Sequence, residues 1–314
     1  MGPAWIALGI VIYYTYSRRK TTVTEEEVVV LREEPLPNKR NYRVLVAIAN
    51  PANAVQLAWQ SYRFCQAKRA EVEVIHMVPV PPQLPLSDAS RSILAGEEAI
   101  TEAMLYLSAG FTFGSTMRYC RNIARGIISA AAEQRTDLLI MGWRGYRRRG
   151  FALGSTVDPV LEQAPCNIVV LKNYHQQKYR RVLVPFAGGP NSAFALEVAS
   201  ILVERKGGRI VVFHISPPGK PTQDIEAFLK EVVPSLGRPS SLFEPGYAIS
   251  RDLLPTLLKE AKHYELVVMG ATRERLFHQV VMGTLPEQFA RHYEKPLAMV
   301  KASNPVKSLL QRWI

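Results

Sequence analysis

Gly142-Trp143-Arg144-Gly145 and, after eight intervening residues, Gly154-Ser155-Thr156 combine the residue types that can hold a phosphate chain. Glycines let the backbone come close to a ligand and adopt positive φ. Free N–H groups and hydroxyls at the start of a helix favour an anion. The pattern is typical of a ribose and phosphate site. Glycine turns and Ser or Thr helix caps are also routine in α/β folds, so a purely structural role is the alternative.

Short apolar runs alternate with helical patterns along the chain, which is typical of parallel strands buried on both faces. We predict strands near 43–49, 72–78, 115–119, 137–141 and 167–171, and then near 181–186, 209–215, 240–244, 265–269 and 296–300. We predict helices near 53–68, 90–109, 122–135 and 156–163. In such sheets ligands bind outside the carboxyl ends of the strands, where the strand order reverses. The glycine elements follow the predicted fourth strand and therefore lie at that edge.

The sequence also repeats itself. Arg43–Pro51 (RVLVAIANP) returns as Arg181–Pro190 (RVLVPFAGGP), and His76 returns as His214. Internal repeats of this kind indicate duplicated structural units. The fold class that we predict is α/β, with two tandem doubly wound parallel sheets of flavodoxin-like or Rossmann-like topology. The first domain covers 42–173 and the second 178–302.

The composition excludes several classes of protein. Of the 314 residues, 47% are hydrophobic and 21% are charged, which excludes a disordered polymer, a collagen-like chain and a polytopic membrane protein. Cys65, Cys120 and Cys166 are far apart, so we expect neither a disulfide framework nor a metal site. We predict no catalytic residue, because the common hydrolase and Walker motifs are missing from the sequence. Nucleic-acid binding rests only on the net charge of +12 and is disfavoured.

The N-terminal segment has the pattern of a membrane helix end. Pro3–Tyr16 (PAWIALGIVIYYTY) is uncharged and Arg18-Arg19-Lys20 follows it. A helix of this length reaches roughly 21 Å, against roughly 30 Å for a bilayer core. Boundary aromatics followed by positive charge favour the cytoplasmic end of a transmembrane helix. We predict a partial transmembrane or anchoring helix over 1–20, with an N-terminal core helix as the alternative.

A linker is predicted over 21–41 and a tail over 303–314. Within the linker, Val28–Leu31 fits either a short edge strand or an extension of the preceding helix. The tail contains PVKSLLQRWI, which fits an interfacial helix or a segment that docks on the second domain.

The glycine elements and the run APCNIVVLK, which ends at Lys172, resemble the universal stress protein family, whose ATP-binding members carry G-x2-G-x9-G-[S/T] at this place. The resemblance covers 42–172 and 180–301. A tandem of such domains behind a membrane helix is similar to the cytosolic tail of bacterial amino acid-polyamine-organocation permeases. The resemblance implies a non-enzymatic module that faces the cytoplasm and regulates a fused or associated amino-acid permease. The resemblance is also compatible with a homo-oligomer.

The resemblance implies ATP or AMP as the ligand and assigns contacts position by position. The implied ribose contact is Gly142, the implied adenine contact is Met77, and the implied phosphate contacts are Arg144, Gly145, Gly154, Ser155 and Thr156. The corresponding and less complete set in the second repeat is Gly270, Arg273, Gly283 and Thr284.

The sequence departs from the family pattern at several places. Arg273 replaces the second glycine in the second repeat, and Ala49 and Ala187 stand where the family has Asp. We therefore expect nucleotide binding, if either repeat has it, in the first. The alternative function is a degenerate scaffold or dimerisation unit that binds no nucleotide. ATP hydrolysis is least favoured, because no general base stands near the glycine elements.

Three further expectations concern strand pairing, the repeated histidines and a basic loop. Family members usually dimerise through their last strands, so the strands near 167–171 and 296–300 should pair within the chain. His76 and His214 fit structural histidines better than acids or bases. Arg147–Arg149 would contact phosphates or anionic lipid, or form a solvated basic loop.

Overall fold

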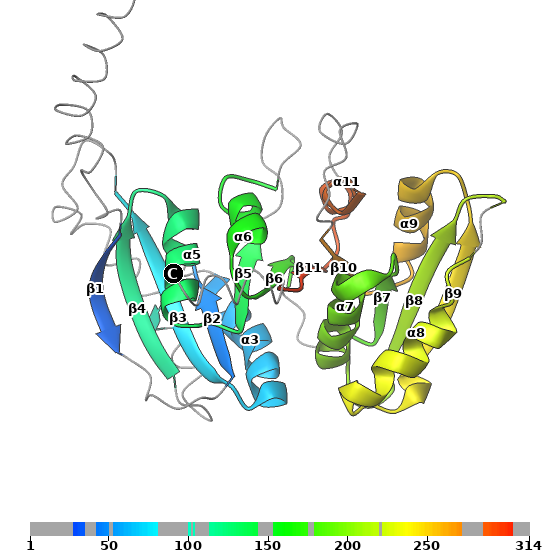
Figure 1. Cartoon of the computed structure of the whole chain (residues 1–314), viewed down its shortest axis with the longest axis horizontal. Coiled ribbons are helices and arrows are strands. Elements are labelled where there is room, and N and C mark those ends of the chain that lie inside the picture. The colour runs from blue at the N-terminus through cyan, green and yellow to red at the C-terminus, as the bar shows by residue number, and fades with distance from the viewer. Residues whose placement is uncertain are drawn as a thin grey trace, which may run out of the picture.

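The computed structural model describes residues 28–34, 42–49, 53–80, 100–101, 103, 113–143, 153–174, 179–219, 222–271 and 285–303 (Figure 1). The N-terminal half contains β1 (Val28–Glu34), β2 (Arg43–Ala47), α3 (Ala54–Lys68), β3 (Glu71–Pro79), β4 (Phe113–Cys120), α5 (Ile123–Glu133), β5 (Leu138–Trp143), α6 (Val157–Gln163) and β6 (Asn167–Lys172). The C-terminal half contains β7 (Arg181–Pro185), α7 (Gly189–Leu202), β8 (Arg209–Ser216), α8 (Ile225–Val232), η5 (Val233–Leu236), η6 (Ser240–Leu242), β9 (Phe243–Ile249), α9 (Leu253–Ala261), β10 (Leu266–Gly270), α11 (Leu285–His292) and β11 (Leu297–Lys301).

All of these strands belong to one sheet with the order β1-β4-β3-β2-β5-β6-β11-β10-β7-β8-β9. The strands β4, β3, β2, β5 and β6 pair in parallel, and so do β9, β8, β7, β10 and β11. The order reverses between β2 and β5 and again between β7 and β10. The α/β class and the parallel strand pairing within each half are therefore as predicted, whereas the two predicted sheets are joined into one through β6 and β11.

Both faces of the sheet are buried. Successive side chains of a strand point to opposite faces, so each strand contributes to two cores. Val44 and Val46 lie in a core with helices α3 and α7, whereas Leu45 lies in the opposite core with α5, α6, α9 and α11. Each core contains residues of both halves. Continuous apolar strands are needed for this arrangement, and the sequence supplies them.

Most predicted strands differ from the observed ones by only a few residues. The clearest difference is β9, predicted near 240–244 and observed at Phe243–Ile249, after a 3-10 turn at Ser240–Leu242. Pro245 and Gly246 interrupt its apolar pattern, and pairing with β8 forms the strand despite them. β1 is an antiparallel edge strand, which was one of the two predicted alternatives for Val28–Leu31.

Several predictions lie outside the described residues: the apolar segment of 1–20, most of the linker, most of the helix near 90–109, and the tail after Ser303. Within the ranges given above, none of the helices has the length and apolar character needed to cross a bilayer.

The two halves meet where β6 and β11 pair antiparallel, from Lys172 opposite Leu297 to Ile168 opposite Lys301. The predicted pairing of these strands is therefore confirmed. Lys172 Nζ donates to the carbonyl oxygens of Ala290 (2.7 Å) and Tyr293 (2.6 Å), at the end of α11. In the reciprocal contact, Lys301 Nζ donates to the carbonyl oxygen of Glu162 (3.2 Å), at the end of α6. Each half thus places a lysine on a helix C-terminus of the other, where a cation is favourable.

Helices α3 and α7 add a second contact between the halves. Arg63 of α3 donates to the carbonyl oxygens of Leu202 and, at 2.8 Å, Val203, which end α7. Lys68 of the same helix forms an ion pair with Glu197. These contacts fix the second helix pair across the junction on the face opposite α6 and α11.

Candidate functional site

The candidate site lies at the carboxyl ends of β2 and β5, where the strand order reverses. Gly142 stands near the end of β5, and its backbone is packed against a tyrosine. A Cβ atom at Gly142 would lie 2.5 Å from Tyr174 Oη, and Tyr174 is buried. A larger residue at this position must displace the tyrosine. The structure thus gives Gly142 a packing role, and the predicted ribose contact stays a prediction.

Gly154 precedes α6 and is a glycine for a conformational reason. Its φ is +130°, and apart from its chain neighbours no atom of the described residues lies within 4 Å of the position that a Cβ would take. The backbone N–H groups of Leu153 and Gly154 donate to the carboxylate of Asp158, at 3.0 and 3.3 Å. An internal anion therefore already accepts from two backbone donors in the turn that precedes this helix.

Trp143 ties the end of β5 to the same turn. Its indole Nε1 donates to the carbonyl oxygen of Leu153 (2.8 Å), and Lys172 Nζ lies 5.3 Å from the centre of its ring. The structure thus brings the first and second glycine elements together, although they are separated in sequence. Trp143 therefore contacts both this turn and Lys172, which lies at the junction of the two halves.

Ser155 and Thr156 directly precede α6 and have accessible side chains. Ser155 is exposed and Thr156 is half-buried. Thr156 is the N-cap residue of α6, and its hydroxyl makes no capping hydrogen bond within the described structure. These two hydroxyls are the predicted phosphate contacts that a ligand can reach.

Met77 lies in the core near the end of β3. It is buried, and its sulfur lies 2.9 Å from the position of a Cβ on Gly126 of α5. The side chain therefore packs the strand against the helix, and its predicted contact with adenine stays a prediction.

In the C-terminal half, Gly270 ends β10 as Gly142 stands near the end of β5. A Cβ at Gly270 would lie 2.9 Å from Cβ of Asn191, so the glycine allows α7 to approach the strand. Asn191 also accepts from the N–H of Ala302 at 2.9 Å. The other predicted contacts, Arg144, Gly145, Arg273, Gly283 and Thr284, lie outside the described residues, as do Arg147–Arg149.

The two repeated histidines make the same contact. His76 Nδ1 bonds the carbonyl oxygen of Ile48 at 2.8 Å, and His214 Nδ1 bonds that of Phe186 at 3.0 Å. Burial lowers the pKa of His76, which favours its neutral form. The contacts support the structural role predicted for these residues.

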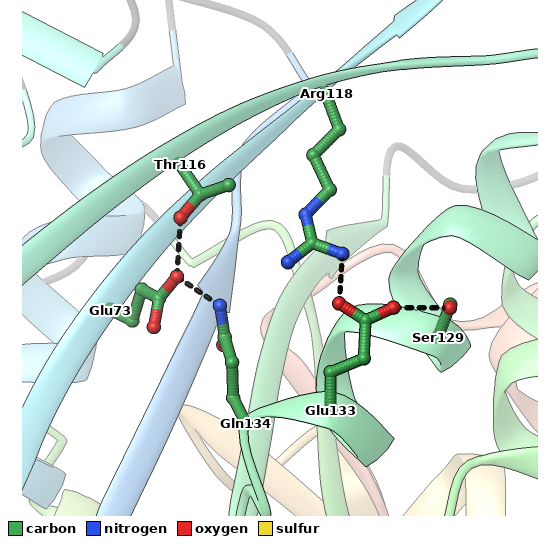
Figure 2. A network of polar contacts seen from close by, with 6 residues as sticks. All are labelled: Glu73, Thr116, Arg118, Ser129, Glu133 and Gln134. Carbon is green, nitrogen blue, oxygen red and sulfur yellow. Dashed lines mark hydrogen bonds and ion pairs between the residues drawn. The ribbon is translucent and has the colours of Figure 1, made fainter. Parts of the chain in front are cut away.

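The sequence analysis missed a polar cluster between α5 and the strands β3 and β4 (Figure 2). Glu73 accepts from Thr116 Oγ1 at 2.5 Å and from Gln134 Nε2. Beside it, Glu133 accepts from Arg118 Nη1 and from Ser129 Oγ, both at 2.6 Å.

The C-terminal half has apolar residues where the cluster has charges. Ile75 pairs with Thr116 in the first half and Phe213 with Gly246 in the second, so Val211 matches Glu73 and Ala248 matches Arg118. Glu73 and Arg118, as charged residues on strands buried in the sheet, were the available sequence signal, although the sequence does not show which partners they take. Because buried charges need partners, the cluster explains how α5 is held.

The described residues hold no group of three or more His, Cys, Asp or Glu side chains that could bind a metal. All three cysteines are buried and unbridged, and burial raises the pKa of Cys65 and of Cys166 to about 12. Their thiols therefore stay protonated near neutral pH, which makes them poor nucleophiles.

Residues 41–172 match the model of the universal stress protein family. The N-terminal half is therefore similar to the universal stress protein domain. Over most of its length the chain is also similar to two curated proteins. One is the Na(+)/H(+) antiporter NhaS5 of Synechocystis, at 24% identity over 81% of this chain and 38% of the antiporter. The other is a universal stress protein of Mycolicibacterium smegmatis, at 24% identity over 83% of this chain and 97% of that protein.

Solved structures share the fold. A universal stress protein from Archaeoglobus fulgidus aligns with a TM-score of 0.60 and 17% identity over 83% of this chain and 97% of that one. A putative universal stress protein from Pseudomonas aeruginosa aligns with a TM-score of 0.52 and 12% identity, over 87% and 97%. The chain spans only about two fifths of the length of the antiporter, the first of the curated relatives named above.

Proposed function

We propose that this chain is a non-enzymatic regulatory module of universal stress protein type on the cytosolic side of a membrane transporter. The observation that carries the proposal is the antiporter match, in which 81% of this chain corresponds to part of a larger membrane protein. The apolar run Pro3–Tyr16, followed by Arg18-Arg19-Lys20, supports attachment to a membrane. The match favours a cation transporter over the amino-acid permease expected from the resemblance.

We further propose that the N-terminal half is the nucleotide-binding half, with ATP or AMP as the ligand. Ser155 and Thr156 present accessible hydroxyls beside Gly154, at the edge where parallel sheets bind ligands. A nucleotide would make its phosphate contacts there and its ribose contact near Gly142. Binding without hydrolysis would let the domain report nucleotide level to the transporter.

One observation favours the alternative, a scaffold that binds no nucleotide. The Asp158 carboxylate already accepts from Leu153 and Gly154, so a phosphate at these donors must compete with a fixed negative charge. Tyr174 likewise takes the space that an added side chain would need at Gly142. A scaffold would need neither the backbone donors of Leu153 and Gly154 nor open space at Gly142.

Thermal unfolding with ATP, AMP and cyclic AMP separates the two functions. A ligand present at 100 times its dissociation constant stabilises the folded state by about 2.7 kcal/mol. For the nucleotide-binding function we expect ATP or AMP to raise the midpoint, and Ser155→Ala with Thr156→Ala to reduce the rise. Asp158→Asn should strengthen ATP binding several-fold, because it removes the competing charge.

The matched control is in the C-terminal half. Gly154→Val should abolish the ATP-dependent rise, whereas Gly283→Val should leave it. Equal losses would contradict the assignment of the site to the N-terminal half. No rise with any nucleotide, in the unmodified chain and in Asp158→Asn alike, would contradict the nucleotide-binding function and favour the scaffold.

A further inference from the structure

The equivalent strands β4 and β9 differ in what lies beyond them in the sheet. At one end β1 pairs antiparallel with β4, from Val28 opposite Cys120 to Glu34 opposite Ser115. At the other end β9 pairs with β8, and no further strand lies beyond it among the residues that the structure describes (Figure 1). An unpaired edge presents backbone donors and acceptors to any strand that can reach them.

The side chains along this edge are apolar and exposed. Tyr247 is 46% exposed and Ile249 is 73% exposed. Their counterparts by sheet register in the N-terminal half are Met117 and Tyr119, each 3% exposed. The same positions are therefore covered in one half and uncovered in the other. We call Pro245, Tyr247 and Ile249 the β9 stripe.

The backbone of the β9 stripe faces outward as well. The N–H of Ser250 donates to the carbonyl oxygen of Ser216 in β8, at 3.0 Å. Peptide groups alternate along a strand, so the N–H groups of Tyr247 and Ile249 point away from β8. Pro245 has no N–H, which is tolerated at an edge. Two donors and the three carbonyl oxygens of the stripe are therefore directed toward solvent.

We propose that the β9 stripe binds a second copy of this chain, with the two β9 strands antiparallel about a twofold axis at Tyr247. In this register Tyr247 faces its own counterpart, and Ile249 faces Pro245. Each strand gives its Tyr247 and Ile249 N–H groups to the other, and only the missing N–H of Pro245 is lost. A twofold contact of this kind closes on itself and forms a dimer.

Charge favours a second copy over other occupants. The stripe carries no charge, and the only charged residue of β9 is Glu244 on the opposite face, 3.3 Å from Arg209. Two identical strands therefore meet without opposing like charges, which would otherwise destabilise the pair. Pairing of β9 with the outer edge of β1 in another copy would be a head-to-tail contact, which continues into a ring or filament instead of closing as a twofold dimer.

Sedimentation velocity of the full chain in detergent micelles tests the proposal. Tyr247→Lys with Ile249→Lys places four like charges at the contact, so the dimer dissociation constant should rise at least about tenfold. The matched control is Thr222→Lys with Ser235→Lys, which adds the same charge at exposed positions off the edge and should leave the constant unchanged.

A covalent readout separates this contact from association through residues 3–16. Tyr247→Cys should form a disulfide-linked dimer under mild oxidation, because opposite Cα atoms on the axis lie about 5.5 Å apart and the native cysteines are buried. Thr222→Cys should stay uncrosslinked. Absence of the Tyr247→Cys dimer, or an unchanged dissociation constant in the lysine variant, would overturn the proposal.

Hydrogen exchange tests which segment covers the stripe. The amides of Tyr247 and Ile249 should become protected as the protein concentration rises. Protection at every concentration would mean that a segment of the same chain covers them, and exposure at every concentration would mean that no second copy binds. Either result contradicts the proposed dimer.

Discussion

Two glycines at the candidate site are constrained in different ways. Gly142 is required by the nearness of Tyr174, whereas Gly154 is required by its φ of +130°. Substitution at Gly142 creates a clash, and substitution at Gly154 strains the backbone. The first effect can be relieved by changing a neighbour, and the second cannot.

We therefore predict that Gly142→Ala destabilises the chain by about 1–3 kcal/mol, the usual cost of an overpacked core. Tyr174→Phe removes the nearest atom and should restore part of the loss, because the next ring atom lies 3.2 Å from the position that the added Cβ would take. Urea unfolding of the two single variants and the double variant measures this coupling. Strictly additive free energies would show that Tyr174 does not constrain Gly142.

At the residue scale, the sequence indicated which glycines are special but not which contacts constrain them. The motif identified Gly142 and Gly154 as special positions, but their neighbours Tyr174 and Asp158 carried no motif signal. A hydrogen bond or contact made by the chain itself cannot be distinguished from a ligand contact by spacing alone. Burial of His76 was predictable from its apolar strand, and the Glu73 cluster was not, because its partners come from different elements.

At the scale of elements, the junction depends on two lysines in equivalent places. Lys172 is buried and donates two short hydrogen bonds to α11, whereas Lys301 is more exposed and its bond to α6 is longer. Hydrogen bonds made by charged groups contribute more when water is excluded. The contribution of the two contacts is therefore unequal despite their symmetry.

We predict that Lys172→Met lowers the free energy of unfolding by about 2 kcal/mol. Lys301→Met, the matched control, should lower it by no more than about 0.5 kcal/mol. Urea titrations of both variants measure the difference. Equal losses would mean that burial at Lys172 adds nothing to its two contacts.

The same substitution should change the dependence of stability on pH. Burial lowers the pKa of Lys172, so the unfolded chain binds more protons just below the ordinary lysine pKa. The contribution of Lys172 to the free energy of unfolding therefore rises with pH in that range. Lys172→Met should remove that rise, and an unchanged slope would contradict the assignment.

Element boundaries were predictable wherever apolar runs were uninterrupted. β2, β5 and β6 are continuous runs of mostly apolar residues, and their predicted positions differ little from the observed ones. β9 was displaced in the prediction because Pro245 and Gly246 break its pattern, although the neighbouring β8 imposes a strand there. Pairing with a neighbouring strand therefore set the boundaries of β9, where the local sequence was ambiguous.

At the scale of the whole molecule, the proposed attachment to a membrane depends on Pro3–Tyr16. We predict that the full chain floats with lipid vesicles and stays bound at high salt, because burial of apolar residues is not screened. A chain that begins at residue 21 lacks Pro3–Tyr16 but keeps β1 on the edge of β4, and it should remain in the soluble fraction. Recovery of the full chain in the soluble fraction at low salt would contradict the membrane proposal.

The position of β11 between β6 and β10 has a consequence for synthesis on the ribosome. Leu297 pairs with Lys172, so the partner of β6 emerges 125 residues after the N-terminal half is complete. At about 5–20 residues per second, this leaves the β6 edge bare for about 6–25 s. During that interval a nascent chain on a neighbouring ribosome can offer its own β6. Co-translational crowding on one messenger RNA would therefore favour misassembled pairs, and chaperone protection should matter most in this interval.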